Sequence, residues 1–204
     1  MLVLAADTSL AILSVALLDD DQLVGAMALE GKGSRNEKLL PAIDFLLAEN
    51  GVERQAIDLF AVTRGPGSFT GVRIGLATLQ GMALALRKPV CAISTHEAAA
   101  HGSEGRVLVY DDAGRAEYYL SVFQDGRETV APRLATAAER DELTASIEQL
   151  VWIPDLIQRD NLALRCARRA AELERSGEGA RYRDVTPIYV RLAEAEVKLQ
   201  QKGS

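Results

Sequence analysis

The stretch RGPGSFTGVRIG occupies residues 64–75 and carries most of the information about the fold. It follows an apolar run at residues 56–63 that predicts a buried strand, and it leads into residues 72–86, which predict a helix. Gly65 and Gly67 allow backbone angles that other residues avoid, and Ser68 or Thr70 can cap the start of the helix. Two interpretations stay open: a tight turn needed for close packing, or a cradle in which free N–H groups of the helix start hold an anion.

The spacing of the glycines argues against two common phosphate loops. A Walker loop needs a lysine after its last glycine, and here Val72 follows Gly71. A dinucleotide fingerprint needs the pattern GxGxxG, but Gly71 comes one residue too late after Gly67. The segment therefore predicts a strand–turn–helix junction of another kind.

The residues around this junction predict an alternation of strands and helices. The acidic triplet of Asp19, Asp20 and Asp21 is interpreted as a hairpin turn, since Asp supports tight turns; metal ligation by the three carboxylates is the alternative. The predicted elements are strands at residues 2–7, 10–18 and 23–29, a helix at 37–50, a strand at 56–63, a helix at 72–86, a strand at 89–93 and a capped helix at 94–100. This order is typical of an α/β fold.

The second half of the chain starts like the first. The apolar run and aspartates at residues 107–112 resemble those at residues 2–7, and residues 121–126 resemble the second strand and its acidic turn. The echo indicates two related units, each starting with three strands, which we divide into a first lobe at residues 1–104 and a second, reduced lobe at residues 105–204. The second lobe is expected to be mostly helical after Pro132.

The composition is that of an ordinary globular protein. The chain has 204 residues, 48% of them hydrophobic, and a formal net charge of −6, which disfavours direct binding to a phosphate backbone. The longest charge-free stretch, at residues 74–86, is too short for a bilayer span, and no basic signal sequence opens the chain. We therefore expect a cytoplasmic protein that does not enter a membrane. Cys91 and Cys166 are expected to be unpaired core thiols.

The helix at residues 72–86 carries two rows of small residues at helical spacing. One row contains Gly71 and Gly75, and the other contains Ala77, Gly81 and Ala85. Glycine inside a helix costs about 1 kcal/mol relative to alanine, so the rows need a packing reason. Packing within the chain and contact with another subunit are both compatible with the pattern.

Two further chemistries concern the histidines and the aspartates of the chain. His96 and His101 form HEAAAH, in which the second histidine is one residue too late for a zinc helix of the HExxH type. Asp7 and Asp112 could hold a metal between the lobes of a nucleotide-dependent phosphotransferase. However, no glycine occurs between Gly126 and Gly177 to lie against an adenine or a phosphate. Three arginines, Arg165, Arg168 and Arg169, are interpreted as a solvated helix face rather than an RNA contact.

The junction, with Asp7-Thr8-Ser9 and the segment PIYVR at residues 187–191, resembles the TsaB (YeaZ) family of proteins required to make threonylcarbamoyladenosine in tRNA. The resemblance covers nearly the whole chain. The family motif loop then consists of Arg64, Gly65, Pro66, Gly67, Ser68, Phe69, Thr70 and Arg73. The sequence departs from the family at Arg35-Asn36, where a His-Ser or His-Thr pair is common, and at Gly114, where an arginine is common.

The resemblance implies an α/β, actin-like, Hsp70-like (ASKHA) fold of two related lobes. It implies a non-catalytic scaffold that supports a catalytic TsaD-like subunit together with a TsaE-like ATPase, and that touches tRNA only indirectly. It implies no cofactor and no metal of its own, because ATP and metal are expected on the partner subunits. The alternatives are a phosphotransferase of the same fold and, least favoured, a metallopeptidase.

The two helices of the first lobe are expected to form the partner face, and the same helices could pair two copies into a homodimer. A bulky residue at Gly75 should then weaken partner binding and leave the fold mostly intact. The expected partner-binding residues are Leu39, Leu40, Ile43, Leu47, Gly71, Val72, Gly75, Leu79 and Met82.

Overall fold

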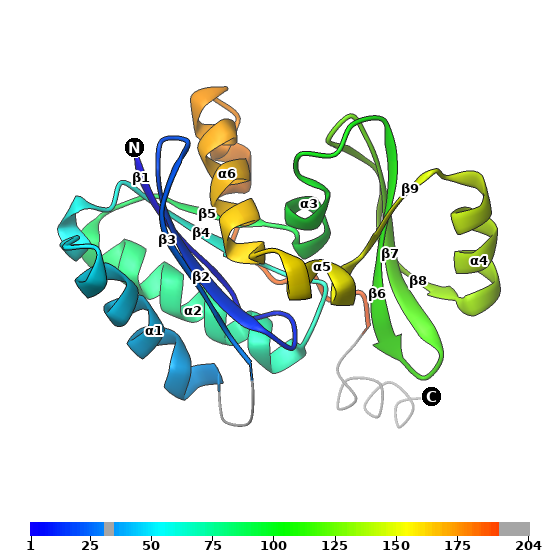
Figure 1. Ribbon diagram of the computed structural model, residues 1–204, viewed down its shortest axis with the longest axis horizontal. Helices are drawn as coiled ribbons and strands as arrows, with labels where there is room; N and C mark the ends of the chain where they lie inside the picture. The colour runs from blue at the N-terminus through cyan, green and yellow to red at the C-terminus, as the bar shows by residue number, and fades with distance from the viewer. Residues whose placement is uncertain (31–34, 192–204) are drawn as a thin grey trace, which may run out of the picture.

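The computed structural model describes residues 1–30 and 35–191, with side chains from residue 37 onward in the second range (Figure 1). Two sheets and their helices form two lobes. In the first 104 residues the elements are β1 (Leu2–Asp7), β2 (Leu13–Asp19), β3 (Gln22–Leu29), α1 (Arg35–Glu49), β4 (Leu59–Thr63), α2 (Phe69–Leu86), β5 (Val90–Ile93) and α3 (Thr95–Ala100). They are followed by β6 (Arg106–Gly114), β7 (Glu117–Gln124), β8 (Arg127–Thr136), α4 (Ala137–Ser146), β9 (Gln149–Trp152), α5 (Ile153–Arg159) and α6 (Leu162–Arg175).

The first sheet has the strand order β3-β2-β1-β4-β5. β1 lies in its middle, antiparallel to β2 and parallel to β4. Its residues Val3, Leu4, Ala5 and Ala6 are all fully buried, which explains why the strand is a continuous apolar run rather than an alternating one. The predicted hairpin between β2 and β3 is confirmed, with Asp20 at a positive φ of 50° in the turn.

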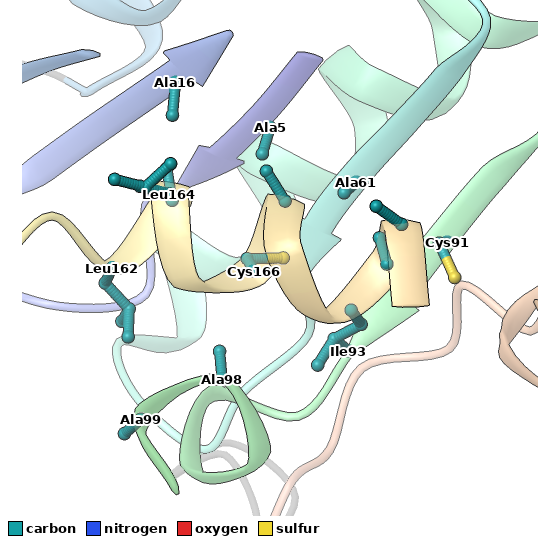
Figure 2. Close-up of a cluster of buried hydrophobic side chains, with 14 of the residues drawn as sticks. Ala5, Ala16, Ala61, Cys91, Ile93, Ala98, Ala99, Leu162, Leu164 and Cys166 are labelled. Atoms are coloured by element: carbon teal, nitrogen blue, oxygen red, sulfur yellow. The ribbon is translucent and has the colours of Figure 1, made fainter. Parts of the chain in front are cut away.

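Helices cover both faces of the first sheet. α1 and α2 pack on one face, where they enclose Leu4, Phe60 and Val62. α6 and α3 lie on the other side, where small side chains of the sheet let α6 approach closely (Figure 2). The small and apolar residues of this second layer include Ala5, Ala16, Ala61, Cys91, Ile93, Ala98, Ala99, Leu162, Leu164 and Cys166. Both cysteines are free and buried, as the sequence predicted.

The second sheet has the order β8-β7-β6-β9 and repeats the start of the first sheet. β6, β7 and β8 form an antiparallel meander like β1, β2 and β3, and β9 is parallel to β6 as β4 is to β1. The predicted echo between the two halves is therefore confirmed. One face of this sheet forms a small core with Leu143 of α4, built on Leu108, Leu120 and Val122.

The expected end of the second lobe is wrong, because the chain returns to the first lobe after α5. α6 packs against β1, β2 and β4 rather than on the second sheet. The Asn161 amide donates to the carbonyl of Met27, and the N–H of Ala163 donates to Ser14 Oγ. These contacts place α6 in the first lobe, whereas the sequence predicts a second lobe that spans residues 105–204.

Arg165 and Arg169 join α6 to α3. Arg165 donates to the carbonyls of Ala99 and His101, and Arg169 pairs with Glu97 at 2.9 Å. These two arginines serve packing between helices rather than a free basic surface.

The remaining differences from the sequence prediction concern element ends. β2 begins at Leu13 rather than residue 10, β4 begins at Leu59 after a short 3₁₀ turn, and α2 begins at Phe69 rather than residue 72. α2 is 18 residues long and apolar enough, by length and composition, to pass as a membrane span. Its apolar character has a different reason here, because Val72, Leu76 and Leu79 pack in the core of the first lobe.

Candidate functional site

The motif loop joins β4 to α2 through a sharp turn. Gly65 has a φ of 96° and Gly67 a φ of 153°, angles at which an L side chain is strained, and the Gly65-Pro66 bond is cis. Ser68 caps α2 by accepting a hydrogen bond from the N–H of Gly71 at 3.2 Å. The glycines are therefore needed for the path of the backbone.

The same loop packs against the turn that follows β1. The N–H of Ser68 donates to the carbonyl of Ser9 at 2.7 Å, and Thr8 Oγ1 donates to the carbonyl of Gly71 at 2.6 Å. A Cβ on Gly67 would lie 2.5 Å from the Ser9 carbonyl oxygen, so any larger residue would push the two loops apart. The N–H groups of Ser68 and Gly71 are already engaged within the protein, and the close approach of Gly67 to Ser9 supports the close-packing interpretation of the motif.

Asp7 organises this junction from the interior. Its side chain is fully buried, and its Oδ1 accepts hydrogen bonds from Ser9 and from Thr63 of β4. The carboxylate therefore holds the end of β1 to β4 and to the following turn. It does not line the cleft between the lobes, where the alternative of a metal shared with Asp112 would need it.

A cleft of about 550 Å³ separates the two lobes. Ser9, Gly67 and Ser68 border it from the first lobe, and Asp111 and Asp112 border it from β6. α5 supplies apolar side chains to its wall. The lining residues that the structure describes include two carboxylates but no lysine or arginine. A bare phosphate group is disfavoured beside these two carboxylates.

Burial raises the pKa of Asp111 from 3.8 to about 6. The N–H of Asp112 donates to Asp111 and opposes the shift, whereas the charges of Asp112 and Asp7 add to it. The folded protein therefore binds this proton more tightly than the unfolded chain. The stability that protonated Asp111 contributes is complete below about pH 4 and is lost as the pH rises through about 6.

Asp111→Asn removes this pH dependence while keeping an oxygen that accepts from Asp112. We expect the variant to raise the free energy of unfolding by about 2 kcal/mol at pH 7.5 and to change it little at pH 4. Urea unfolding of both proteins at the two pH values measures the difference. An equal effect at both pH values would show that the carboxyl is not perturbed as described.

The histidines do not assemble a metal site. His96 is fully buried, its Nδ1 lies 2.7 Å from Ser121 Oγ, and burial lowers its pKa to about 3. His101 instead lies 3.3 Å from Glu172 of α6. Within the part of the chain that the structure describes, no three His, Cys, Asp or Glu side chains come together to hold an ion. No observation of the described residues favours the metallopeptidase alternative.

The structure corrects the predicted partner face on α1 and α2. Leu40 is exposed and Met82 is partly exposed, but the other seven residues are buried in the first lobe: Leu39, Ile43, Leu47, Gly71, Val72, Gly75 and Leu79. Their helical spacing marks the stripe that faces the sheet. The prediction that these seven residues form an exposed surface is therefore wrong.

Positions 71 and 75 require glycine because α2 passes close to the residues that follow β1 and to β4. A Cβ on Gly71 would lie 2.0 Å from the carbonyl oxygen of Thr8, and one on Gly75 would lie 2.4 Å from Thr8 Oγ1. A bulky residue at Gly75 would thus disturb the fold, contrary to the sequence-based expectation.

The outward side of the two helices also carries large exposed apolar side chains. Leu84 is 80% exposed, Phe45 54% and Leu40 46%. The second row of small residues also lies on this side, and a Cβ on Gly81 would meet nothing within 4 Å. We call this surface the α1–α2 face; its exposed members are Leu40, Pro41, Phe45, Ala48, Ala77, Gly81, Leu84 and Ala85.

Sequence reasoning missed Phe45 and Leu84. The row of Ala77, Gly81 and Ala85 is visible in the sequence, and in the structure all three residues are exposed on the outward side of α2. The stronger apolar stripe of α1 packs in the core, so its spacing indicates the buried side of the helix and not the exposed side.

Comparison with known sequences identifies relatives over most of the chain. The family model TsaD, described as tRNA N6-adenosine threonylcarbamoyltransferase, matches residues 33–171, which is more than half of the chain. The TsaB protein of Bacillus subtilis, named for tRNA threonylcarbamoyladenosine biosynthesis, is 30% identical over 97% of this chain and 97% of its own length. TsaB of Escherichia coli is 36% identical over 61% of this chain and 55% of its own length.

Solved structures agree with these relatives. YeaZ from Pseudomonas aeruginosa superposes with a TM-score of 0.72 at 28% identity and covers 92% of this chain and 99% of that chain. An inorganic polyphosphate/ATP-glucomannokinase from Arthrobacter superposes with a TM-score of 0.51 at 13% identity over 85% of this chain and 99% of that chain, a likeness of fold alone. The expected actin-like fold of two related lobes is confirmed. The chain belongs to the TsaD family of the matching model and, within it, to the TsaB (YeaZ) proteins.

Proposed function

We propose that the chain acts in the biosynthesis of threonylcarbamoyladenosine in tRNA as a non-catalytic subunit that docks a TsaD-like catalytic subunit on the α1–α2 face. Membership of the TsaB family supports the pathway. The observation that carries the docking role is the set of large apolar side chains exposed on the outward side of two helices whose inner sides already fill the core. Such a surface has a physical reason to exist when a partner covers it.

The size of the exposed side chains fits this role. Burying a leucine or phenylalanine side chain stabilises a complex by about 1.5–3 kcal/mol, and three such side chains lie exposed on the face. The small residues Ala77, Gly81 and Ala85 allow a partner helix to approach the backbone of α2 closely. The face therefore suits helix-on-helix packing.

The other surfaces support a scaffold rather than a catalyst. The interlobe cleft is bordered by carboxylates, and Asp7 is committed to buried hydrogen bonds. On this proposal the chain holds no cofactor of its own, and ATP and metal are bound by the TsaD-like subunit and by a TsaE-like ATPase that joins the pair. A net charge of −6 suits indirect rather than direct contact with tRNA, and the complex works in the cytoplasm.

The same face can pair two copies when the partner is absent. A symmetric pair would bury the apolar side chains of both copies, and it would compete with docking of the TsaD-like subunit. We therefore propose that free protein forms a concentration-dependent homodimer, which the partner dissociates. Sedimentation over a range of concentrations, with and without partner, measures this exchange.

Reconstitution tests the function directly. Purified TsaD-like and TsaE-like subunits, the enzyme that supplies threonylcarbamoyl-adenylate, ATP and unmodified tRNA are combined with and without this chain, and the modified nucleoside is measured by mass spectrometry. Product that depends on this chain supports the proposal. Equal product without it would contradict the proposal and turn attention to nucleotide binding in the cleft.

A further inference from the structure

One charged residue of α2, Arg73, lies beside the α1–α2 face in the first turns of the helix. Arg73 is the only charged residue between Phe69 and Leu86. It is exposed, and it lies one helical turn before Ala77 and in line with Gly81 and Leu84. A cation near a helix N-terminus is opposed by the helix dipole, so its position does not stabilise α2. The contacts of the Arg73 side chain therefore have to be considered next to those of the α2 backbone.

Two aromatic rings hold the Arg73 side chain in place. Its guanidinium carbon lies 4.0 Å from the centre of the Phe69 ring and 5.6 Å from that of Tyr189. Its Nε donates a hydrogen bond to the Tyr189 hydroxyl at 2.7 Å. The two terminal nitrogens make no hydrogen bond or ion pair with any residue in the described part of the chain. The guanidinium is thus held in place through Nε, while its two terminal nitrogens remain able to donate hydrogen bonds to a partner.

Tyr189 is itself anchored by the segment that leads away from α6. The N–H of Ile188 donates to the carbonyl of Arg64 at 2.7 Å, and the Ile188 carbonyl lies so close to Gly65 that a Cβ there would be 2.8 Å away. Further along, Arg191 pairs with Glu117 and donates to the carbonyl of Ala113 in the second lobe. Contacts on both sides of Tyr189 therefore fix its ring over the start of α2.

A fixed but unpaired guanidinium has a predictable consequence when a partner covers the face. Removing the charge from water is costly unless a new acceptor replaces the water molecules. A carboxylate matches the two terminal nitrogens of arginine in a bidentate pair, and a side chain that is already ordered loses little entropy on binding. Buried arginines beside aromatic rings are frequent energetic centres of interfaces.

We propose that Arg73, held by Phe69 and Tyr189, is the charged anchor of the α1–α2 face and receives an aspartate or glutamate of the docked subunit. This inference rests on the proposed function, because it requires a partner on that face. The partner is then a helical subunit that presents a carboxylate opposite the first turns of α2 and apolar side chains opposite Gly81 and Leu84. The pairing orients the partner along α2, since the apolar part of the face has no such directional contact.

The test measures the dissociation constant for the TsaD-like subunit by calorimetric titration. Arg73→Gln is expected to weaken binding about 30-fold or more, and Arg73→Glu further, because the partner carboxylate is left unpaired or repelled. Arg73→Lys keeps the charge but loses the planar fork, so we expect an intermediate loss. Tyr189→Phe removes only the hydrogen bond that fixes Arg73 and is expected to weaken binding a few-fold. Arg127→Gln, at an exposed arginine of β8 in the other lobe, is the matched control and should leave the constant unchanged.

Two further measurements separate the possible failures. The wild-type dissociation constant should rise with salt concentration more steeply than that of Arg73→Gln, because an ion pair has been removed. If Leu84→Asp abolishes binding while Arg73→Gln leaves it unchanged, docking on the face stands and the anchor is refuted. If neither variant affects binding, the proposed docking face itself fails. If Arg73→Gln alters homodimer formation alone, the carboxylate belongs to a second copy, and the proposal is overturned.

Discussion

Gly71→Ala is expected to lower the free energy of unfolding by about 3 kcal/mol, although alanine normally stabilises a helix interior. The added Cβ would lie 2.0 Å from the carbonyl oxygen of Thr8, where an ordinary contact is longer than 3 Å. That carbonyl belongs to the backbone after β1, which Asp7 and Ser9 hold in place by buried hydrogen bonds. Neither α2 nor β1 can move without opening the core between them.

Gly81→Ala provides the matched control in the same helix. No atom lies within 4 Å of a Cβ at this position, so only helix propensity changes, and we expect a gain of about 1 kcal/mol. Urea unfolding monitored by circular dichroism, at one protein concentration, measures both variants. Opposite signs are the expected result. A stabilising effect of Gly71→Ala would show that α2 does not cross the β1 loop as closely as described.

Leu84→Asp is expected to weaken binding of the TsaD-like subunit at least 100-fold and to reduce product in the reconstituted reaction accordingly. Leu84 is the most exposed large apolar side chain of the described residues, and it lies beside the small residue Gly81. A partner that covers it would bury an unpaired carboxylate in place of an apolar side chain. The stability of the isolated chain should change little, because the side chain makes few contacts within the fold.

Leu150→Asp tests whether such a loss is specific to the α1–α2 face. Leu150 is also exposed, at 43%, but lies on β9 in the other lobe. We expect it to leave partner affinity within about two-fold of the wild type. Thermal unfolding of both variants checks that each is folded. Equal losses at Leu84 and Leu150 would point to general destabilisation rather than to a docking face.

Much of the fold was predictable from local patterns. Continuous apolar runs predicted the central strands, because strands buried on both faces leave no place for polar residues. The resemblance between residues 107–112 and residues 2–7 predicted the second meander, which β6 and β7 confirm. The resemblance of the motif loop to TsaB proteins predicted the family. These signals lie within short windows of sequence or within one motif.

The placement of α6 and the exposed side of α2 were not predictable in the same way. The sequence pattern of α6 is that of an amphipathic helix, and this pattern does not specify which sheet the helix packs against. Its packing on the first sheet depends on residues such as Ser14 and Met27, which lie more than a hundred positions earlier. The candidate site shows the same limit. The sequence contains two rows of small residues on α2. A small residue permits another segment to approach closely, but it does not identify which segment does so.

The sequence by itself therefore determined the order of strands and helices in the first 100 residues, the repeat at the start of the second lobe, the family motif and the presence of a helix suited to close packing. The tertiary structure alone decided that Gly71 and Gly75 face Thr8, that Gly81 and Leu84 face outward, and that Tyr189 lies over Arg73. The physical reason is that local periodicity depends on neighbours along one helix. Which side of that helix is covered depends on strands and loops brought together from distant parts of the chain.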